Sequence, residues 1–227
     1  MPDLNERIGQ LSALAEPVRR ALYAHVVGQR EAVTREQAAA AVDVQVHVAK
    51  FHLDRLVEDG LLEADYRRPP GRGGPGAGRP AKVYRRSNLE VEVSLPERRY
   101  DVAGRVLVRA VAQAEREGIP VAEALEHVAV DAGREAGVQV ARKNRRRSTT
   151  KTVVDTLVEQ GYEPYVERDG IRLANCPFDT LARDETALVC GMNLCYLGGV
   201  LEGMGAEGLT AELEPTPGQC CVHLRKV

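Results

Sequence analysis

Five cysteines at the C-terminal end of the chain are the residues with the most evident chemistry. The first 175 residues contain none, and the last quarter then carries Cys176, Cys190, Cys195, Cys220 and Cys221. Thiolates bind soft metals, and accessible thiolates are also open to oxidation. An odd number of cysteines argues against a closed disulfide framework. The clustering therefore indicates a metal centre or an oxidant-responsive site in the rear of the chain.

The sequence around these thiols predicts two hairpins separated by a helix. The expected strands are 162–168, 171–174, 209–213 and 219–225, and the expected helix is 186–204. Asp169-Gly170 is typical of a hairpin turn between the first two strands. Cys176 then follows a strand end, and Cys190 lies in the first half of the helix. A strand end, a helix and a last strand can converge on one site even when their residues are far apart in sequence.

Three of the thiols are expected to share that site. Cys190 and Cys195 are five residues apart, which is about 140° around a helix, so we expect Cys195 to face the core. Cys220 and Cys221 would open the last strand and point to opposite faces, so one of the two would normally be a ligand. The expected set is Cys176, Cys190 and one of this pair, with Cys220 favoured. The fourth ligand stays open among Cys221, His223, an acid such as Asp179 or Glu185, and a small molecule.

The front third of the chain predicts three helices in a helix-turn-helix order. The expected helices are 16–27, 35–41 and 45–59. Thr34 and Gln37 form a capping box at the start of the second helix, and Gly60 ends the third. The third helix is expected to bury Val48, Phe51, Leu53, Leu56 and Val57. Its outer face would then read DNA, as the recognition helix does in this motif.

A basic hairpin is expected directly after this third helix. Residues 61–66 and 81–85 predict two strands, and the Gly/Pro/Arg-rich segment between them predicts a wing. Residues 67–86 carry seven arginines and lysines and no Asp or Glu, so a polyanion would bind here although the net charge of the chain is only −2. The expected DNA contacts are Gln45, His47, Lys50, Arg67, Arg68, Arg72, Arg79 and Lys82.

The chemistry of the reading face is less specific than its position. Gln45 and Lys50 could contact phosphates alone. The valines around them (Val44, Val46 and Val48) make the face half apolar, and it lacks the arginines typical of guanine readout.

The whole chain is expected to be an α+β protein with two functional ends. We expect a winged helix-turn-helix domain over 1–88, a connector over 89–98, a helical linker and dimerisation region over 99–161, and a C-terminal α/β sensor domain with a small antiparallel sheet over 162–227. Helices are predicted over 99–117 and 121–142, and a third follows Ser148 or Thr149. One of these is expected to pair subunits, since palindromic sites are read by two-fold dimers.

Composition favours a cytoplasmic protein that does not enter a membrane. The longest apolar stretch, Ala187–Leu201, contains Asn193 and is shorter than the roughly 20 residues that a membrane span needs. The polar N-terminus lacks the apolar core of a signal peptide. In a reducing compartment, clustered thiols favour metal binding or redox chemistry over structural disulfides.

Several segments together resemble one family of regulators. The segments FHLDRLVEDGLL and GRPAKVYR, followed by NCPF, LVCGMN and GQCC, are similar to the SufR-type regulators of iron–sulfur cluster assembly, within the wider ArsR/DeoR-like helix-turn-helix group. The resemblance covers nearly the whole chain. It implies a dimeric repressor that holds an iron–sulfur cluster, [2Fe–2S] or [4Fe–4S], in each C-terminal domain and releases its operator when the cluster is lost or oxidised. Cys176, Cys190 and Cys220 match the family's ligand positions, whereas the remaining position falls near Met204, where this chain has no cysteine.

Three other functions compete with this one. A structural zinc site could form from three thiolates and His223, although close Cys-x2-Cys pairs are absent. A winged-helix regulator could instead bind an apolar small molecule between its C-terminal helices. A thiol enzyme using Cys190 with His127 or His223 is disfavoured, because no motif places these residues together. We therefore expect a regulator and not an enzyme.

Overall fold

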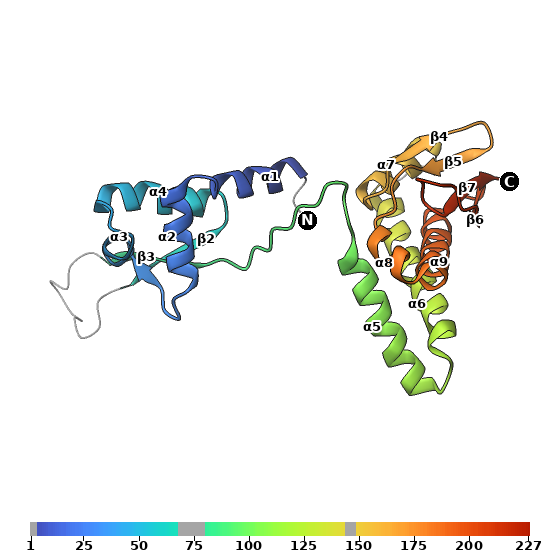
Figure 1. Ribbon diagram of the computed structural model, residues 1–227, viewed down its shortest axis with the longest axis horizontal. Coiled ribbons are helices and arrows are strands. Elements are labelled where there is room, and N and C mark those ends of the chain that lie inside the picture. Colours follow the sequence, from blue (N-terminus) through green and yellow to red (C-terminus); the bar gives the residue numbers. More distant parts are fainter. Residues whose placement is uncertain (1–3, 68–79, 144–148) are drawn as a thin grey trace. The chain divides into compact units, whose positions relative to one another are not determined.

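The chain divides into two compact units, Met1–Val93 and Ser94–Val227. We describe them from a computed structural model that covers residues 4–67, 80–143 and 149–227 (Figure 1). Arg68, Arg72 and Arg79, which the sequence predicts to contact DNA, lie outside these described residues. Each unit has its own hydrophobic core, and the division falls inside the connector expected over 89–98.

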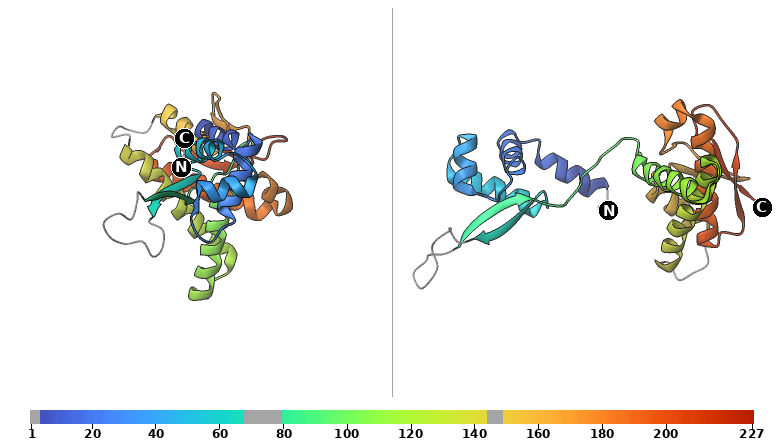
Figure 2. Two further views of the ribbon diagram at one scale, coloured as in Figure 1. Left: turned by 90° about the vertical axis from the view of Figure 1, so that its left-hand side faces the viewer. Right: turned by 90° about the horizontal axis from the view of Figure 1, so that it is seen from below.

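The first unit is a helix-turn-helix domain with a strand hairpin at its end. Its elements are α1 (Leu4–Ala13), α2 (Pro17–Val27), β1 (Val33–Thr34), α3 (Arg35–Val42), α4 (Val46–Glu58), β2 (Leu62–Arg67) and β3 (Ala81–Arg86). The strands form an antiparallel sheet in the order β1-β3-β2. Figure 2 shows the β2–β3 hairpin projecting from the helices as a wing. The predicted winged helix is therefore present, and α1 and β1 are additions that the sequence pattern did not reveal.

Local chemistry explains where these elements begin and end. The Thr34 side chain accepts from the Gln37 backbone N–H while the Gln37 side chain accepts from the Thr34 backbone N–H, which is the expected capping box. Asp43 adopts a left-handed conformation (φ 55°) that ends α3 and turns the chain into α4. The core beneath is formed by α2, α4 and β3 and includes the fully buried Leu22, Leu53 and Tyr84.

The second unit is a four-stranded sheet with helices. Its elements are α5 (Tyr100–Glu117), α6 (Val121–Lys143), α7 (Thr150–Glu159), β4 (Pro164–Val166), β5 (Gly170–Leu173), α8 (Asp179–Asp184), α9 (Thr186–Met204), β6 (Leu209–Leu213) and β7 (Val222–Lys226). All strand pairs are antiparallel, in the order β4-β5-β7-β6. The expected helices and hairpins are present, and the short α8 was not predicted.

The helical segment and the cysteine segment belong to one body. Residues 99–161 and 162–227 were expected as separate regions, but α5, α6, α7, α9 and the sheet share a single core. α5 packs against α6, and α6 packs against α9. The cysteines are thus fixed in the same packed unit as the long helices.

Helix α9 is the centre of this core. Its 19 residues are long and apolar enough to cross a membrane by length and composition alone, yet 56% of this apolar stretch is buried inside the protein. The elements α6, α8, β6 and β7 pack against it, and from Val189 to Met204 nine of its side chains or backbone positions are buried. This burial identifies α9 as a core helix of the folded unit.

Glycines let α6 and α9 approach each other closely. Gly133 and Gly137 on α6 face the backbone of α9, and Gly199 and Gly203 on α9 face the backbone of α6. A β-carbon on Gly199 would lie 2.1 Å from the Val130 carbonyl oxygen, which is far inside van der Waals contact. The two backbones therefore touch at a distance that only glycine allows.

Candidate nucleic-acid interface and thiol cluster

The outward face of α4 carries the residues predicted to read DNA. Gln45, His47 and Lys50 are all exposed. Gln45 is the N-cap residue of the helix, but its side chain makes no capping hydrogen bond and so remains available to a ligand. His47 and Lys50 are three residues apart, about 60° around the helix, so these two share one face of α4.

Phe51 corrects the predicted packing of this helix. The sequence pattern placed it with the buried residues, but its side chain is 65% exposed, and Val46 at the start of the helix is 42% exposed. Ala49, Leu53 and Leu56 form the buried stripe instead. The apolar residues at 51 and 53 are two apart, which is about 200° around a helix, so both cannot face one core. Val44 and Val48 are half-buried, which leaves Val46 and Phe51 as the exposed apolar side chains at the start of α4.

Asp54 connects the recognition helix to the wing. Its carboxylate accepts from Lys82 Nζ at 2.6 Å and from the Tyr84 hydroxyl at 2.8 Å, both on β3. Lys50 Nζ, one turn earlier on α4, lies 3.3 Å from the other carboxylate oxygen. Burial raises the pKa of Asp54, but the hydrogen bonds from Lys82, Tyr84 and Lys50 outweigh it, so the pKa is lowered. Two predicted DNA contacts, Lys50 and Lys82, are thus held together by one carboxylate.

The rest of the described wing carries paired cations. Arg67 at the end of β2 lies 3.8 Å from Asp65, and Arg85 Nη2 on β3 lies 2.8 Å from Glu63. All four side chains of these two pairs are more than 40% exposed, so phosphates can compete for the arginines at little cost.

Four of the five thiols meet in the second unit. Their pKa values show that these thiols act on one another: Cys220 raises the pKa of Cys176, Cys176 lowers and Cys221 raises that of Cys220, and burial raises that of Cys190 against a smaller lowering by Cys221. The order along this series joins the end of β5, the turn before β7 and the first half of α9. The structure therefore brings together the three residues predicted as ligands and adds Cys221 as the fourth member.

Cys221 joins because the last strand begins later than predicted. β7 starts at Val222, so Cys220 and Cys221 lie in the preceding turn and not in the pleat of a strand. The alternation of side chains that would have separated them applies only within the strand. Cys195 lies on the part of α9 beyond the cluster, partly buried against the core, as its helical position predicted.

A buried polar network fixes the loop that carries Cys176. The Asn175 side chain, 7% exposed, donates to the carbonyl oxygens of Gly161 and Glu97 at 2.9 and 3.3 Å. Arg98 Nη1 donates to Asn175 Oδ1 and to the Cys176 carbonyl oxygen at 2.7 and 2.6 Å. Each of these buried polar groups has a partner, which stabilises one conformation of the loop.

The Cys220 sulfur is supplied with N–H donors. It accepts from Asn193 Nδ2 at 3.2 Å and from the Val222 backbone N–H. Asn193 is fully buried on α9, and its Oδ1 accepts from the Tyr162 hydroxyl at 2.5 Å. The hydrogen bond from Cys176 lowers the Cys220 pKa, but its hydrogen bond to Cys221 and its burial outweigh this and raise the pKa to about 12. The N–H donors around the Cys220 sulfur would suit a thiolate.

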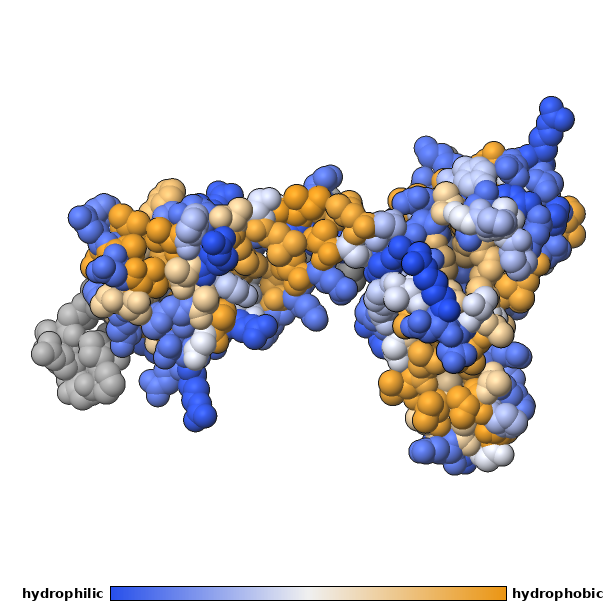
Figure 3. Space-filling view, in the orientation of Figure 1, coloured by the Kyte–Doolittle hydropathy of each residue, from blue (hydrophilic) through white to orange (hydrophobic). Residues whose placement is uncertain are grey.

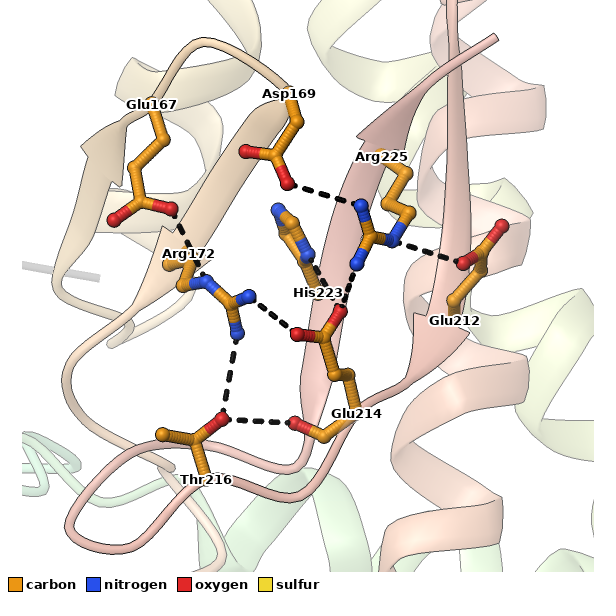
Figure 4. Close-up of polar contacts among 8 residues, drawn as sticks. All are labelled: Glu167, Asp169, Arg172, Glu212, Glu214, Thr216, His223 and Arg225. Atoms are coloured by element: carbon orange, nitrogen blue, oxygen red, sulfur yellow. Dashed lines mark hydrogen bonds and ion pairs between the residues drawn. The ribbon is translucent and has the colours of Figure 1, made fainter.

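His223, the other predicted fourth ligand, lies in a different network (Figure 4). Its Nδ1 is 3.1 Å from Glu214 Oε2, and its Nε2 lies against Gly170, where an added β-carbon would be 2.9 Å away. The Glu214 carboxylate also contacts Arg172 and Arg225. Hydrogen bonds from Arg172, His223 and Arg225 lower the Glu214 pKa to about 2. The imidazole is thus engaged with an ion-pair network and is not directed at the thiols.

No ready-made single-ion site is present in the parts of the chain that the structure covers. Among residues 4–67, 80–143 and 149–227, no three His, Cys, Asp and Glu side chains are arranged to hold a metal ion. The four thiols form a series of contacts rather than a shell around one point.

Comparison with known proteins identifies the first unit. Residues 14–64 match a helix-turn-helix domain family. The matched segment runs from the end of α1 to β2 and includes the complete α2–α3–α4 arrangement. No curated protein and no solved structure matches the chain. The helix-turn-helix domain supports a DNA-binding transcriptional regulator. The β2–β3 hairpin after α4 makes this domain a winged helix.

Proposed function

We propose that this protein is a transcriptional repressor whose affinity for double-stranded DNA is controlled by an iron–sulfur cluster. The cluster would be bound by the thiols of Cys176, Cys190, Cys220 and Cys221. The observation that carries the proposal is the meeting of these four thiols from distant segments within the same chain as a winged helix. Its resemblance to SufR-type regulators gives the expected target, the genes of iron–sulfur cluster assembly.

DNA binding follows from the first unit. Lys50 and Lys82 lie on either side of Asp54, and the exposed Arg67 continues the basic surface along β2. Cations on a recognition helix and its wing neutralise phosphates, while side chains at the start of the helix contact base edges. Binding should therefore weaken steeply with added salt.

The kind of donors in the second unit supports an iron–sulfur cluster. Such clusters are held by cysteine thiolates and are tuned by hydrogen bonds to the sulfurs. Here four thiols gather, and the Cys220 sulfur already receives N–H groups from Asn193 and Val222. Cys221 would serve as the fourth thiolate in place of the cysteine that the chain lacks near Met204. When bound, a cluster would supply sensitivity to oxygen and to oxidants.

The chain would convert the state of the thiols into a change in DNA affinity. Cys176 follows β5, Cys220 and Cys221 precede β7, and Cys190 lies on α9, so a bound group would tie two neighbouring strands to the central helix. Loss of the group would free the turn before β7. A ligand shifts such an equilibrium only by its differential affinity for the two arrangements.

We propose that two copies act together in the cytoplasm. Two-fold dimers are the usual readers of palindromic sites. Along α5 the apolar side chains of Val108 and Val111 are exposed, as is Val121 at the start of α6, and Figure 3 shows apolar surface in this region. This face offers a surface for pairing.

The test is an anaerobic purification followed by iron and sulfide analysis. We expect a coloured protein, loss of the colour in Cys176→Ser and Cys220→Ser, and no loss in the matched control Cys195→Ser. Operator affinity should fall when the cluster is removed from the wild-type protein. A colourless protein that holds zinc and binds DNA equally in both states would refute the cluster-controlled switch while leaving DNA binding intact.

A further inference from the structure

The start of helix α4 exposes two apolar side chains among polar ones. Val46 is 42% exposed and Phe51 is 65% exposed. With 100° per residue, positions 46, 47, 50 and 51 lie within an arc of about 140°, so Val46 and Phe51 flank His47 and Lys50 on one face. The Phe51 ring is turned away from the core and makes an edge contact with the adjacent His52, with ring centroids 5.2 Å apart.

The charges around these side chains indicate the kind of partner. Lys50 and Arg55 lie on the same helix, and Lys82 and Arg67 lie on the adjoining strands, with their side chains 29–55% exposed. The core of a protein–protein interface is depleted of charge, whereas this strip contains Lys50 and Asp54 and borders on Lys82, which Asp54 also binds. A polyanion that also offers small apolar groups suits it better.

The major groove of DNA offers such groups. Each thymine projects a C5-methyl into it, and phenylalanine and other apolar side chains contact that methyl directly. Guanine is usually read by arginine or lysine in bidentate contacts, and the exposed start of α4 has Lys50 but no arginine before Arg55. The face is therefore better equipped for A·T pairs than for G·C pairs.

We propose that Val46 and Phe51 read the C5-methyl groups of pyrimidines, in the first place thymine, at the centre of each operator half-site. His47 and Lys50 between them make the polar contacts. This inference rests on the proposed DNA binding and adds to it the base chemistry that the recognition helix selects. It also gives a reason for two exposed apolar side chains, Val46 and Phe51, on the otherwise polar outward face of this helix.

The experiment uses DNA that the protein itself selects. Full-length protein is first used to enrich duplexes from a random library, and the selected operator is then resynthesised with uracil in place of thymine, one position at a time. Uracil pairs as thymine does and lacks only the methyl. We expect about fourfold weaker binding for each contacted methyl, since burying a methyl-sized group stabilises by about 0.8 kcal/mol and 1.4 kcal/mol is tenfold.

Variants of the helix assign the effect to the side chains. Phe51→Ala should bind the thymine and uracil duplexes equally at one position, and Val46→Ala should do so at another. Phe51→Leu keeps an apolar side chain and should retain most of the preference, which separates methyl contact from a loss of folding. Replacing the contacted T·A pair by 5-methylcytosine·G, compared with C·G, shows whether the methyl is read irrespective of the base.

The outcomes are distinct. A uracil operator bound as tightly as the thymine operator at every position would overturn the inference, as would a methyl preference that persists unchanged in both Phe51→Ala and Val46→Ala. A protein that enriches no sequence and binds no duplex would instead refute the proposed DNA-binding function. A methyl preference that each alanine variant abolishes at its own position supports the inference.

Discussion

The ammonium of Lys82 on strand β3 lies 2.6 Å from the carboxylate of Asp54 on helix α4. This pair spans the two elements that a winged helix presents to DNA, and Tyr84 strengthens the link through a 2.8 Å hydrogen bond to the same oxygen. An acidic residue on a DNA-reading face repels phosphate, so the presence of Asp54 there needs a structural reason. The reason is that its carboxylate holds the wing against the recognition helix.

Asp54→Ala should destabilise the first unit and weaken operator binding together. The fully buried Tyr84 would lose the acceptor for its hydroxyl, at a cost of about 1–3 kcal/mol. Asp54→Asn retains an acceptor oxygen and should cost less. Chemical denaturation measures the stability of both Asp54 variants, and a binding titration measures their operator affinity. Glu58→Gln, an exposed substitution on the same helix, is the control. Equal stability of Asp54→Ala and Glu58→Gln would show that the link to Tyr84 carries little energy.

The Asp54 carboxylate should make the unfolding free energy of the first unit sensitive to acid. Burial alone would raise the Asp54 pKa, but hydrogen bonds from Lys82, Tyr84 and Lys50 lower it below its ordinary value of 3.8. A carboxyl group whose folded-state pKa is lowered stabilises the protein fully above the unfolded value and loses this contribution as pH falls through the folded value. The difference in unfolding free energy between wild type and Asp54→Asn should therefore be constant from pH 5 to 7 and shrink below about pH 4. A difference that is unchanged down to pH 2 would contradict the assignment.

The front of the chain was predictable because its signals are local. The capping box at Thr34 and Gln37 and the basic hairpin after α4 depend on residues close in sequence. Phe51 was wrongly placed in the core, since an apolar residue at this position fits the general hydrophobicity of the helix. Only its angle relative to Leu53 and Leu56, together with its 65% exposure, shows that it faces outward.

The thiol cluster was partly predictable. Strand ends and helix positions indicated that Cys176, Cys190 and Cys220 could meet. The role of Cys221 depended on where β7 begins: the strand starts at Val222 and not at residue 219, so the alternation of side chains within a strand does not apply to Cys220 and Cys221. The position of His223 depended on its partner Glu214, which comes from the turn after β6. Such pairings between distant segments have no local signal.

The contact between α6 and α9 makes a sharp prediction about two adjacent glycines. Gly199→Ala would place a β-carbon 2.1 Å from the Val130 carbonyl oxygen, so the helices must separate, at a cost of about 3 kcal/mol or more. Gly198→Ala meets nothing within 4 Å and should stabilise the helix by about 0.5–1 kcal/mol. Thermal unfolding of the second unit measures both. Similar melting temperatures for the two variants would show that the helices are not in backbone contact.

The last prediction concerns the hydrogen bonds that link Tyr162 to Asn193 and Asn193 to the Cys220 sulfur. Tyr162→Phe removes the donor to Asn193 Oδ1 in a buried site and should destabilise the second unit by about 1–2 kcal/mol, while the 3.2 Å contact from Asn193 Nδ2 to sulfur is retained. Asn193→Ala removes both contacts, so it should be less stable still and should also retain less iron after anaerobic reconstitution.

Thermal unfolding and iron content, measured on the same preparations, separate the two effects. N–H donors lower the charge density on a ligating thiolate, so iron retention should follow the Asn193 amide and not the overall stability. Tyr162→Phe with normal iron content and Asn193→Ala with reduced content is the expected pair of results. Iron loss that instead parallels the melting temperature in both variants would mean that Asn193 supports the fold alone. Metal binding at Cys220 would then depend on the neighbouring thiols alone. The contact between the Asn193 amide and the Cys220 sulfur would be a consequence of packing around Tyr162.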